Sequence, residues 1–169
     1  MGGTQNTTVP SAGVLYVARV NLELPPSYTV TKIYVRVGTA GITLTNCYAG
    51  IYSSVGGLLA RTADQSTVWT TASGYAMAIA FDGSGGAISS LAVTASAGTL
   101  VWVGLLVGSA TTLPAFRAGA NVADLINAGA AAGTKRFGQN GTGLVALPSS
   151  ITPTSVTNTS FSPWLALGA

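Results

Sequence analysis

Side chains that could transfer protons near neutral pH are scarce in this chain of 169 residues, which has four carboxylates and no histidine. A glycosidase needs two carboxyl groups flanking the scissile bond, and the sequence places no two of these four together. A serine hydrolase needs a general base, usually histidine, and no G-x-S-x-G turn is present. We therefore expect no enzymatic activity. The four carboxylates are Glu23, Asp64, Asp82 and Asp124.

Side chains that could bind a metal or a cofactor are also scarce. With no histidine and a single cysteine, Cys47, the chain cannot assemble a zinc tetrad. The turn at Asp82-Gly83-Ser84 has one carboxylate, too few for a calcium loop. The glycine-rich runs 38–41 and 83–86 lack the lysine of a phosphate-binding loop, so we interpret them as turns. We expect no cofactor and no metal, and we expect Cys47 to be a buried strand residue without a disulfide partner.

Charge is low and dispersed. Charged residues make up 7% of the chain, against about 25% in typical domains. Seven basic and four acidic residues give a net charge of +3. The basic residues are scattered along the sequence, whereas nucleic-acid binding requires clusters. The longest apolar run, 100–107, is far shorter than the ~20 residues of a membrane-spanning helix. We therefore expect neither nucleic-acid binding nor membrane insertion, and we infer that much of the surface is buried against other subunits.

Aromatic residues are the best candidates for contacts with a partner. Trp102 lies in an apolar run, which indicates the core or a subunit interface. Trp69 lies in the polar segment VWTTASGY, where it could stack on a sugar ring, anchor a protein contact or close the core. Phe116 and Arg117 follow Pro114 and are of types enriched at interfaces. These four residues are the predicted interface or ligand-contact positions.

Most of the chain consists of short apolar or alternating runs between turn residues. The alternation is clearest in residues 29–37, where Ile33, Val35 and Val37 are every second residue, a pattern typical of a half-buried strand. Such strands with glycine-rich turns predict an all-β fold, a jelly-roll-like antiparallel sandwich. The expected strands are 14–22, 29–37, 44–54, 58–61, 75–81, 87–93, 99–107, 145–151 and 164–167, with a hairpin turn at 55–57.

The length fits one domain. Residues 1–12 are polar and end in Pro10-Ser11-Ala12, which predicts an extended N-terminal arm, and residues 13–169 form the expected sandwich domain. Residues 121–133 could be a short helix or a long loop. The run 99–107 is apolar on both faces, which predicts a central strand covered by the core on one side and by a neighbouring subunit on the other.

Four segments in order carry a resemblance to a known family: VTKIYVRVGTAGITLTNCYAGIYSSVGGLLARTADQSTVW, GTLVWVGLLVGSATTLPAFRAG, KRFGQNGTGLVALPSSIT and SPWLALG. They resemble β-sandwich domains in virion proteins of tailed phages that infect actinobacteria, described as minor tail proteins or the tips of tail fibres. The resemblance implies a non-enzymatic structural protein of the virion, assembled in the host cytoplasm as a homotrimer. Its partners would be itself, other tail or capsid proteins and a host cell-surface glycan.

Two other functions stay open. Related domains often belong to longer chains with attachment regions, and here a short arm precedes the sandwich, which raises the possibility of a capsid decoration protein. A carbohydrate-binding module, with Trp69 or tyrosines as a stacking surface, is an alternative from a different class.

Overall fold

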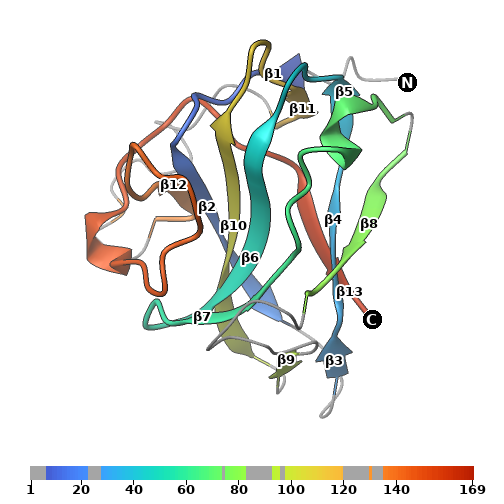
Figure 1. Ribbon diagram of the computed structural model, residues 1–169. Coiled ribbons are helices and arrows are strands. Elements are labelled where there is room, and N and C mark those ends of the chain that lie inside the picture. Colours follow the sequence, from blue (N-terminus) through green and yellow to red (C-terminus); the bar gives the residue numbers. More distant parts are fainter. Residues whose placement is uncertain are drawn as a thin grey trace, which may run out of the picture.

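The computed structural model describes residues 7–22, 28–73, 75–82, 93–95, 98–119, 130 and 135–169, and this part of the chain is built mainly of antiparallel strands (Figure 1). The expected all-β, antiparallel sandwich is therefore confirmed. The strands are β1 (Thr7–Thr8), β2 (Leu15–Leu22), β3 (Tyr28–Val30), β4 (Lys32–Val35), β5 (Val37–Thr39), β6 (Thr45–Ser53), β7 (Leu58–Arg61), β8 (Met77–Ala80), β9 (Val93–Ala95), β10 (Thr99–Ser109), β11 (Ala115–Arg117), β12 (Phe137–Gln139) and β13 (Leu165–Gly168). Two 3-10 turns, η1 (Val68–Thr70) and η2 (Pro153–Ser155), complete the described elements.

The main sheet has five strands in the order β12-β2-β10-β6-β7. Its centre is β10, which pairs with β2 from Thr99↔Leu22 to Leu106↔Leu15 and with β6 along its other edge. The predicted hairpin turn joins β6 to β7 and is confirmed. Gly56 in that turn has a φ of +102°, a conformation that glycine adopts without steric cost.

The second layer forms around the chain from residue 28 to residue 39, which was predicted as one strand over 29–37. That prediction is wrong in detail, because the run divides into β3, β4 and β5, each with different partners. The central piece, β4, lies between β13 and β8, whereas β3 pairs with β9 and β5 pairs with β11. A register shift between Ala115 and Phe116 accompanies the last exchange, as is usual at a β-bulge.

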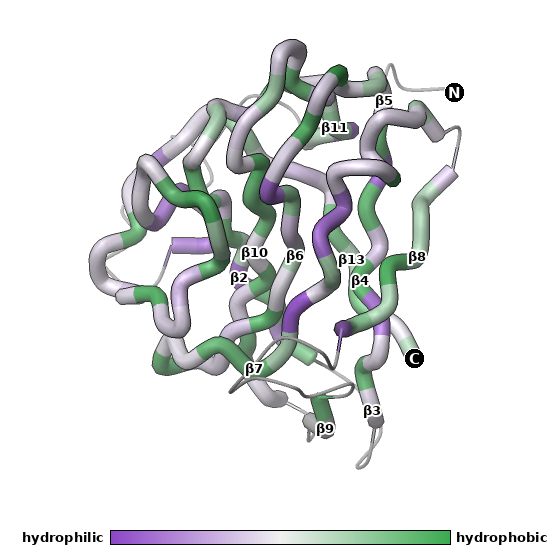
Figure 2. Tube along the Cα trace, viewed as in Figure 1, coloured by the Kyte–Doolittle hydropathy of each residue, from purple (hydrophilic) through white to green (hydrophobic). Residues whose placement is uncertain are grey.

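The core lies between these two layers and follows from the alternation of the strands. In β4 and β5, Ile33, Val35 and Val37 point inward and are fully buried. Inward-facing residues of β6 and β10, such as Ile51 and Val103, meet them from the main sheet. Figure 2 shows the strands of both layers mainly in green and white, the colours of apolar and neutral residues.

The outer face of the main sheet is also covered, and its cover comes from the same chain. Leu147, Ile151 and Val156 pack on a second buried cluster, to which β10 contributes Trp102 and Leu106. In Figure 1 the orange segment between β12 and β13 lies over this side of the sheet. The expectation that a neighbouring subunit covers the second face of residues 99–107 is therefore wrong.

This covering segment, residues 141–156, contains no strand. The strand predicted for residues 145–151 is therefore also wrong. Near the start of β7 the segment makes isolated main-chain contacts and no continuous ladder. Leu58 N–H donates to Ser149 O at 2.9 Å, and Ser150 forms an isolated bridge with Gly57. Pro148 lies inside the segment, and proline cannot donate to a strand ladder.

Other predictions have mixed outcomes. The runs 14–22, 44–54, 58–61, 75–81, 99–107 and 164–167 do contain strands, whereas β11 and β12 were not predicted. Within the predicted arm, Thr7–Thr8 forms β1 and pairs with β11. Most of the run 87–93 and the helix-or-loop segment 121–133 lie outside the described residues.

Candidate functional site

Three of the four predicted contact residues are buried within a single copy of the chain. Trp69 and Trp102 are 0% exposed and Phe116 is 1% exposed. Trp69 and Phe116 pack edge to face, with ring centroids 5.0 Å apart, and Trp102 belongs to the cluster under the covering segment. None of the three therefore has a free ring face for a sugar or a partner, and the core alternative describes the positions of both tryptophans.

Trp69 is buried because the polar segment before it folds back on the main sheet. Gln65 O accepts hydrogen bonds from Val68 N–H and Trp69 N–H at 3.0 Å, and Trp69 O accepts one from Gly41 N–H. Upstream, the buried Thr62 accepts from Ala49 N–H through Oγ1 at 3.1 Å. Thr70 and Thr71 beside Trp69 lie at the surface, so the polar character of these neighbours does not predict the exposure of the tryptophan itself.

Asp64 has a structural role in the same segment. Its carboxylate accepts from Cys47 N–H at 2.9 Å, Asn46 N–H at 3.2 Å and Ser66 N–H at 2.9 Å. These bonds hold the crossover against the start of β6, where Asn46 has a φ of +58°. The carboxylate is thus occupied by main-chain donors. Of the other acids, Asp82 is described and Glu23 and Asp124 lie outside the described residues.

Cys47 is buried, as predicted, and its thiol contacts Thr45 O. Burial, followed by the charge of Asp64, raises the pKa of this thiol from 9.0 to about 12. Burial also raises the pKa of Tyr52. Both groups are neutral when protonated, so the folded protein keeps these protons at pH values where the unfolded chain has lost them.

We expect the free energy of unfolding to decrease as the pH rises from about 9 toward 12, because proton release from Cys47 then favours the unfolded chain. The urea midpoint of the wild type should fall over this window. The fall should be smaller in Cys47→Ala, with the remainder due to Tyr52 and other groups. An equal fall in both proteins would contradict the assignment.

A pocket of about 370 Å³ is lined by residues of the second layer. Arg36 lies on the chain between β4 and β5, Arg117 ends β11, and Trp164 precedes β13. The described residues that line this pocket are Arg36, Ala76, Arg117, Ala118, Gly119 and Trp164.

Main-chain hydrogen bonds bring these distant parts of the sequence together. Arg117 N–H donates to Arg36 O at 2.8 Å, and Trp164 N–H donates to Arg117 O at 2.8 Å. Gly119 N–H donates to Ser162 O at 3.0 Å. The pocket is therefore built where β4, β5, β11 and β13 meet, and its lining residues are tied to the sheet backbone.

Strand alternation sets the direction of the two arginines. Val35 and Val37 on either side of Arg36 are fully buried, and Phe116 before Arg117 is in the core. The two arginine side chains therefore lie on the outer face of this layer. Trp164 is 47% exposed, and it was predicted only as the first residue of a late strand.

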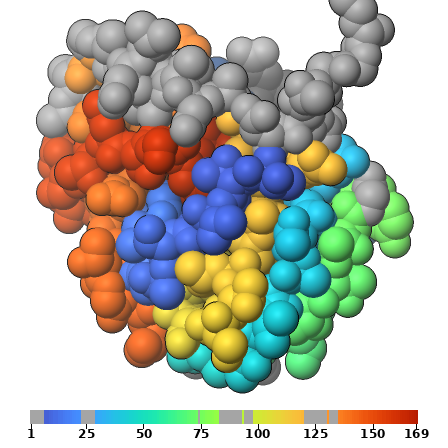
Figure 3. All heavy atoms as spheres, turned by 90° about the horizontal axis from the view of Figure 1, so that it is seen from above, coloured from blue at the N-terminus to red at the C-terminus, as the bar shows by residue number. Residues whose placement is uncertain are grey.

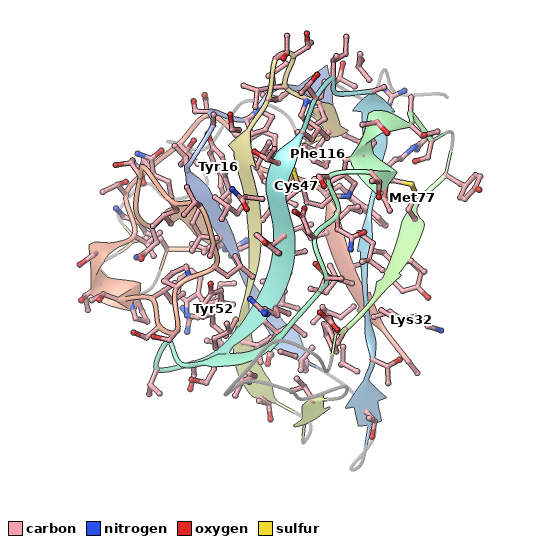
Figure 4. The ribbon with its side chains drawn as sticks, viewed as in Figure 1. Tyr16, Lys32, Cys47, Tyr52, Met77 and Phe116 are labelled. Atoms are coloured by element: carbon pink, nitrogen blue, oxygen red, sulfur yellow. The ribbon has the colours of Figure 1, made fainter. Side chains whose placement is uncertain are left out.

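The same outer face continues along β4. Lys32 and Tyr34 are opposite Ala80 and Ala78 of β8 and opposite Gly168 and Ala166 of β13. Figure 4 shows Lys32 pointing away from the fold. The Tyr34 ring lies against Gly168, where a Cβ atom would approach its Cε2 to 2.6 Å. Because these neighbours are small, the long side chains of β4 project beyond the side chains of β8 and β13 on this face.

Among the described residues, no group of three or more histidine, cysteine, aspartate or glutamate side chains could hold a metal ion. In the same part of the chain, no helix has the length and apolarity needed to cross a membrane. No family profile, curated protein or solved structure matches this chain.

Proposed function

We propose that this chain is a non-enzymatic structural protein of a tailed-phage virion, a minor tail protein that assembles as a homotrimer. The proposal is supported by four segments of the sequence that resemble such proteins and occur in the same order. The assembly proposal rests on the low proportion of charged residues, 7% of the chain, together with apolar side chains exposed at the surface. Exposed large hydrophobic residues of the described part are Val9, Ile42, Val55, Val68, Tyr75, Val145 and Trp164.

Three of these residues gather at one end of the sandwich. Val9 follows Thr8 of β1, which pairs with Phe116 of β11, and Ile42 bridges Thr112. Val68 precedes Trp69, whose carbonyl accepts from the residue before Ile42. Figure 3, which shows the molecule from above, has the blue, yellow, cyan and green segments side by side at this end. We name Val9, Ile42 and Val68 the apical patch.

The apical patch is the proposed contact between copies. Exposed apolar groups that approach one another at one end gain free energy when a second copy excludes water from them. A trimer uses head-to-tail contacts around a threefold axis, so the apical patch would meet a different surface of the next copy. The main sheet does not contribute, because its two faces are covered within one chain.

Ile42→Asp is expected to convert the oligomer into monomers at micromolar concentration. The substitution places a charge in the apical patch, whose desolvation on association is unfavourable. Val55→Asp is the matched control, since Val55 is an exposed valine in the β6–β7 turn. Sedimentation velocity measures the result. A wild-type protein that is already monomeric, or a trimer that survives Ile42→Asp, would contradict the apical contact.

The virion assignment is tested by mass spectrometry of purified particles. The protein should remain with the particles through density-gradient purification, in a fixed ratio to the tail proteins. Tails separated from heads should retain it. Recovery with heads alone would instead support the capsid decoration function, and absence from both would refute a virion role.

A further inference from the structure

The pocket beside β4, β11 and β13 combines two kinds of recognition chemistry. Arg36 and Arg117 supply two guanidinium groups, and the half-exposed Trp164 supplies an aromatic ring. The rest of the described lining is small: Ala76, Ala118 and Gly119. A volume of about 370 Å³ is at the lower end of the roughly 300–1,000 Å³ of small-molecule sites.

We propose that this pocket binds a sugar residue that carries an acidic group. The guanidinium group presents paired N–H donors in a planar fork that matches a carboxylate or a phosphate. A tryptophan ring offers a flat apolar face with a polar edge, which suits the face of a sugar ring. The proposal rests on the proposed virion function only for the location of the ligand, which would be on the host surface. Whether the pocket binds such a sugar does not depend on that function.

The charge of the pocket favours an anion over a neutral ligand. Of the lining residues that the structure describes, Arg36 and Arg117 are cationic and none is a carboxylate. Each arginine also has an interaction within the chain. Because a guanidinium group has five N–H donors, it can bind a ligand in addition to an interaction within the chain.

The arrangement is also suited to a small ligand rather than to a polymer read along its length. The lining residues are joined by main-chain hydrogen bonds between β11, Arg36 and the residues before β13, so the site is preorganised. Its volume of about 370 Å³ is also at the lower end of the range for small-molecule sites.

The test is isothermal titration calorimetry of the full chain with three probes: methyl glucuronide, glucose 6-phosphate and methyl glucoside. At least one acidic probe should bind, and the neutral glucoside should bind more than about tenfold more weakly, since a hydrogen bond to a charged group contributes about 1.5–3 kcal/mol. Preference for the glucuronide identifies the acidic group as a carboxylate, and preference for the sugar phosphate identifies a phosphate. Binding of the acidic probe should also weaken as salt is added.

The variants separate the pocket from general charge. Arg117→Gln and Trp164→Ala should each weaken binding of the acidic probe by about tenfold or more. Lys32→Gln, which removes the same charge from the same face outside the pocket lining, and Tyr75→Ala, which truncates an exposed aromatic residue, should stay within about twofold of the wild type. Each variant is compared only after its urea midpoint shows that it is folded.

Three results would overturn the proposal: no binding of either acidic probe to folded protein, equal binding of glucuronide and glucoside, or a loss in Lys32→Gln as large as that in Arg117→Gln. The probe and salt measurements use the wild type, so they decide the question even if a variant fails to fold. Failure of binding would leave the virion assignment intact, and absence of the protein from virions would leave the binding result intact.

Discussion

Trp69→Ala is expected to lower the free energy of unfolding by about 3–5 kcal/mol, the usual cost of removing a large buried aromatic side chain. The Trp69 side chain is fully buried and packs edge to face on Phe116. Its loss leaves a cavity between η1 and β11 and removes the aromatic contact as well. Urea denaturation followed by circular dichroism measures the change.

Tyr75→Ala is the control for this prediction, because Tyr75 is an exposed aromatic residue in the segment before β8. Its truncation should change the free energy of unfolding by less than about 0.5 kcal/mol. If Trp69→Ala were as mild as Tyr75→Ala, Trp69 would not be the core residue described here.

Ile151→Asp is expected to cost at least about 3 kcal/mol, because it places an unpaired carboxylate where an apolar side chain is buried. Ile151 packs on the cluster that contains Trp102 and Leu106, and its N–H donates to Gly56 O at 2.8 Å. Displacement of the covering segment would also admit water to Trp102. We therefore expect a lower urea midpoint together with a red shift of tryptophan emission.

Val145→Asp provides the matched comparison, since Val145 belongs to the same covering segment but is exposed. It should leave both the midpoint and the emission near the wild-type values. The two measurements also distinguish cover by the same chain from cover by a neighbouring subunit. A wild-type midpoint that rises with protein concentration while Ile151→Asp has no effect would place the cover in another copy.

Much of the sandwich could be predicted because alternation directly reports burial on one face of a strand. Ile33, Val35 and Val37 illustrate this, and all three are fully buried. The cover of the main sheet could not be predicted in the same way. Apolar residues do not alternate regularly in residues 141–156. The backbone of this segment is also irregular, with Pro148 inside it and positive φ angles at Gly141 and Gly143. The apolar run of β10 indicated that a second cover existed, but not which chain supplied it.

The candidate site was harder to predict for a different reason. Arg36, Arg117 and Trp164 are far apart in the sequence and meet through the pairing of strands that exchange partners. Arg117 was identified from its interface-prone neighbourhood, whereas Arg36 was read as a scattered cation. Polar neighbours suggested an exposed Trp69; Thr70 and Thr71 are exposed, but the Trp69 side chain packs on Phe116 in the core. Local composition therefore could not distinguish the exposed tryptophan from the buried one.

The shortage of charge in this chain has two separate explanations in the structure. Part of the apolar sequence is used to cover both faces of the main sheet within one copy. The rest reaches the surface, where the apical patch is the proposed contact between copies and the arginine-lined pocket is the proposed contact with an acidic sugar. The proposed virion function connects these two proposed contacts, since an assembled tail protein needs one surface for its copies and another for the host.

Electron cryo-microscopy of intact virions tests the virion function most directly. We expect tail density into which three copies of this sandwich fit around a threefold axis, with the apical patch buried between them. Tail density that leaves no place for the sandwich, with the protein found only on the head or in no part of the particle, would contradict it.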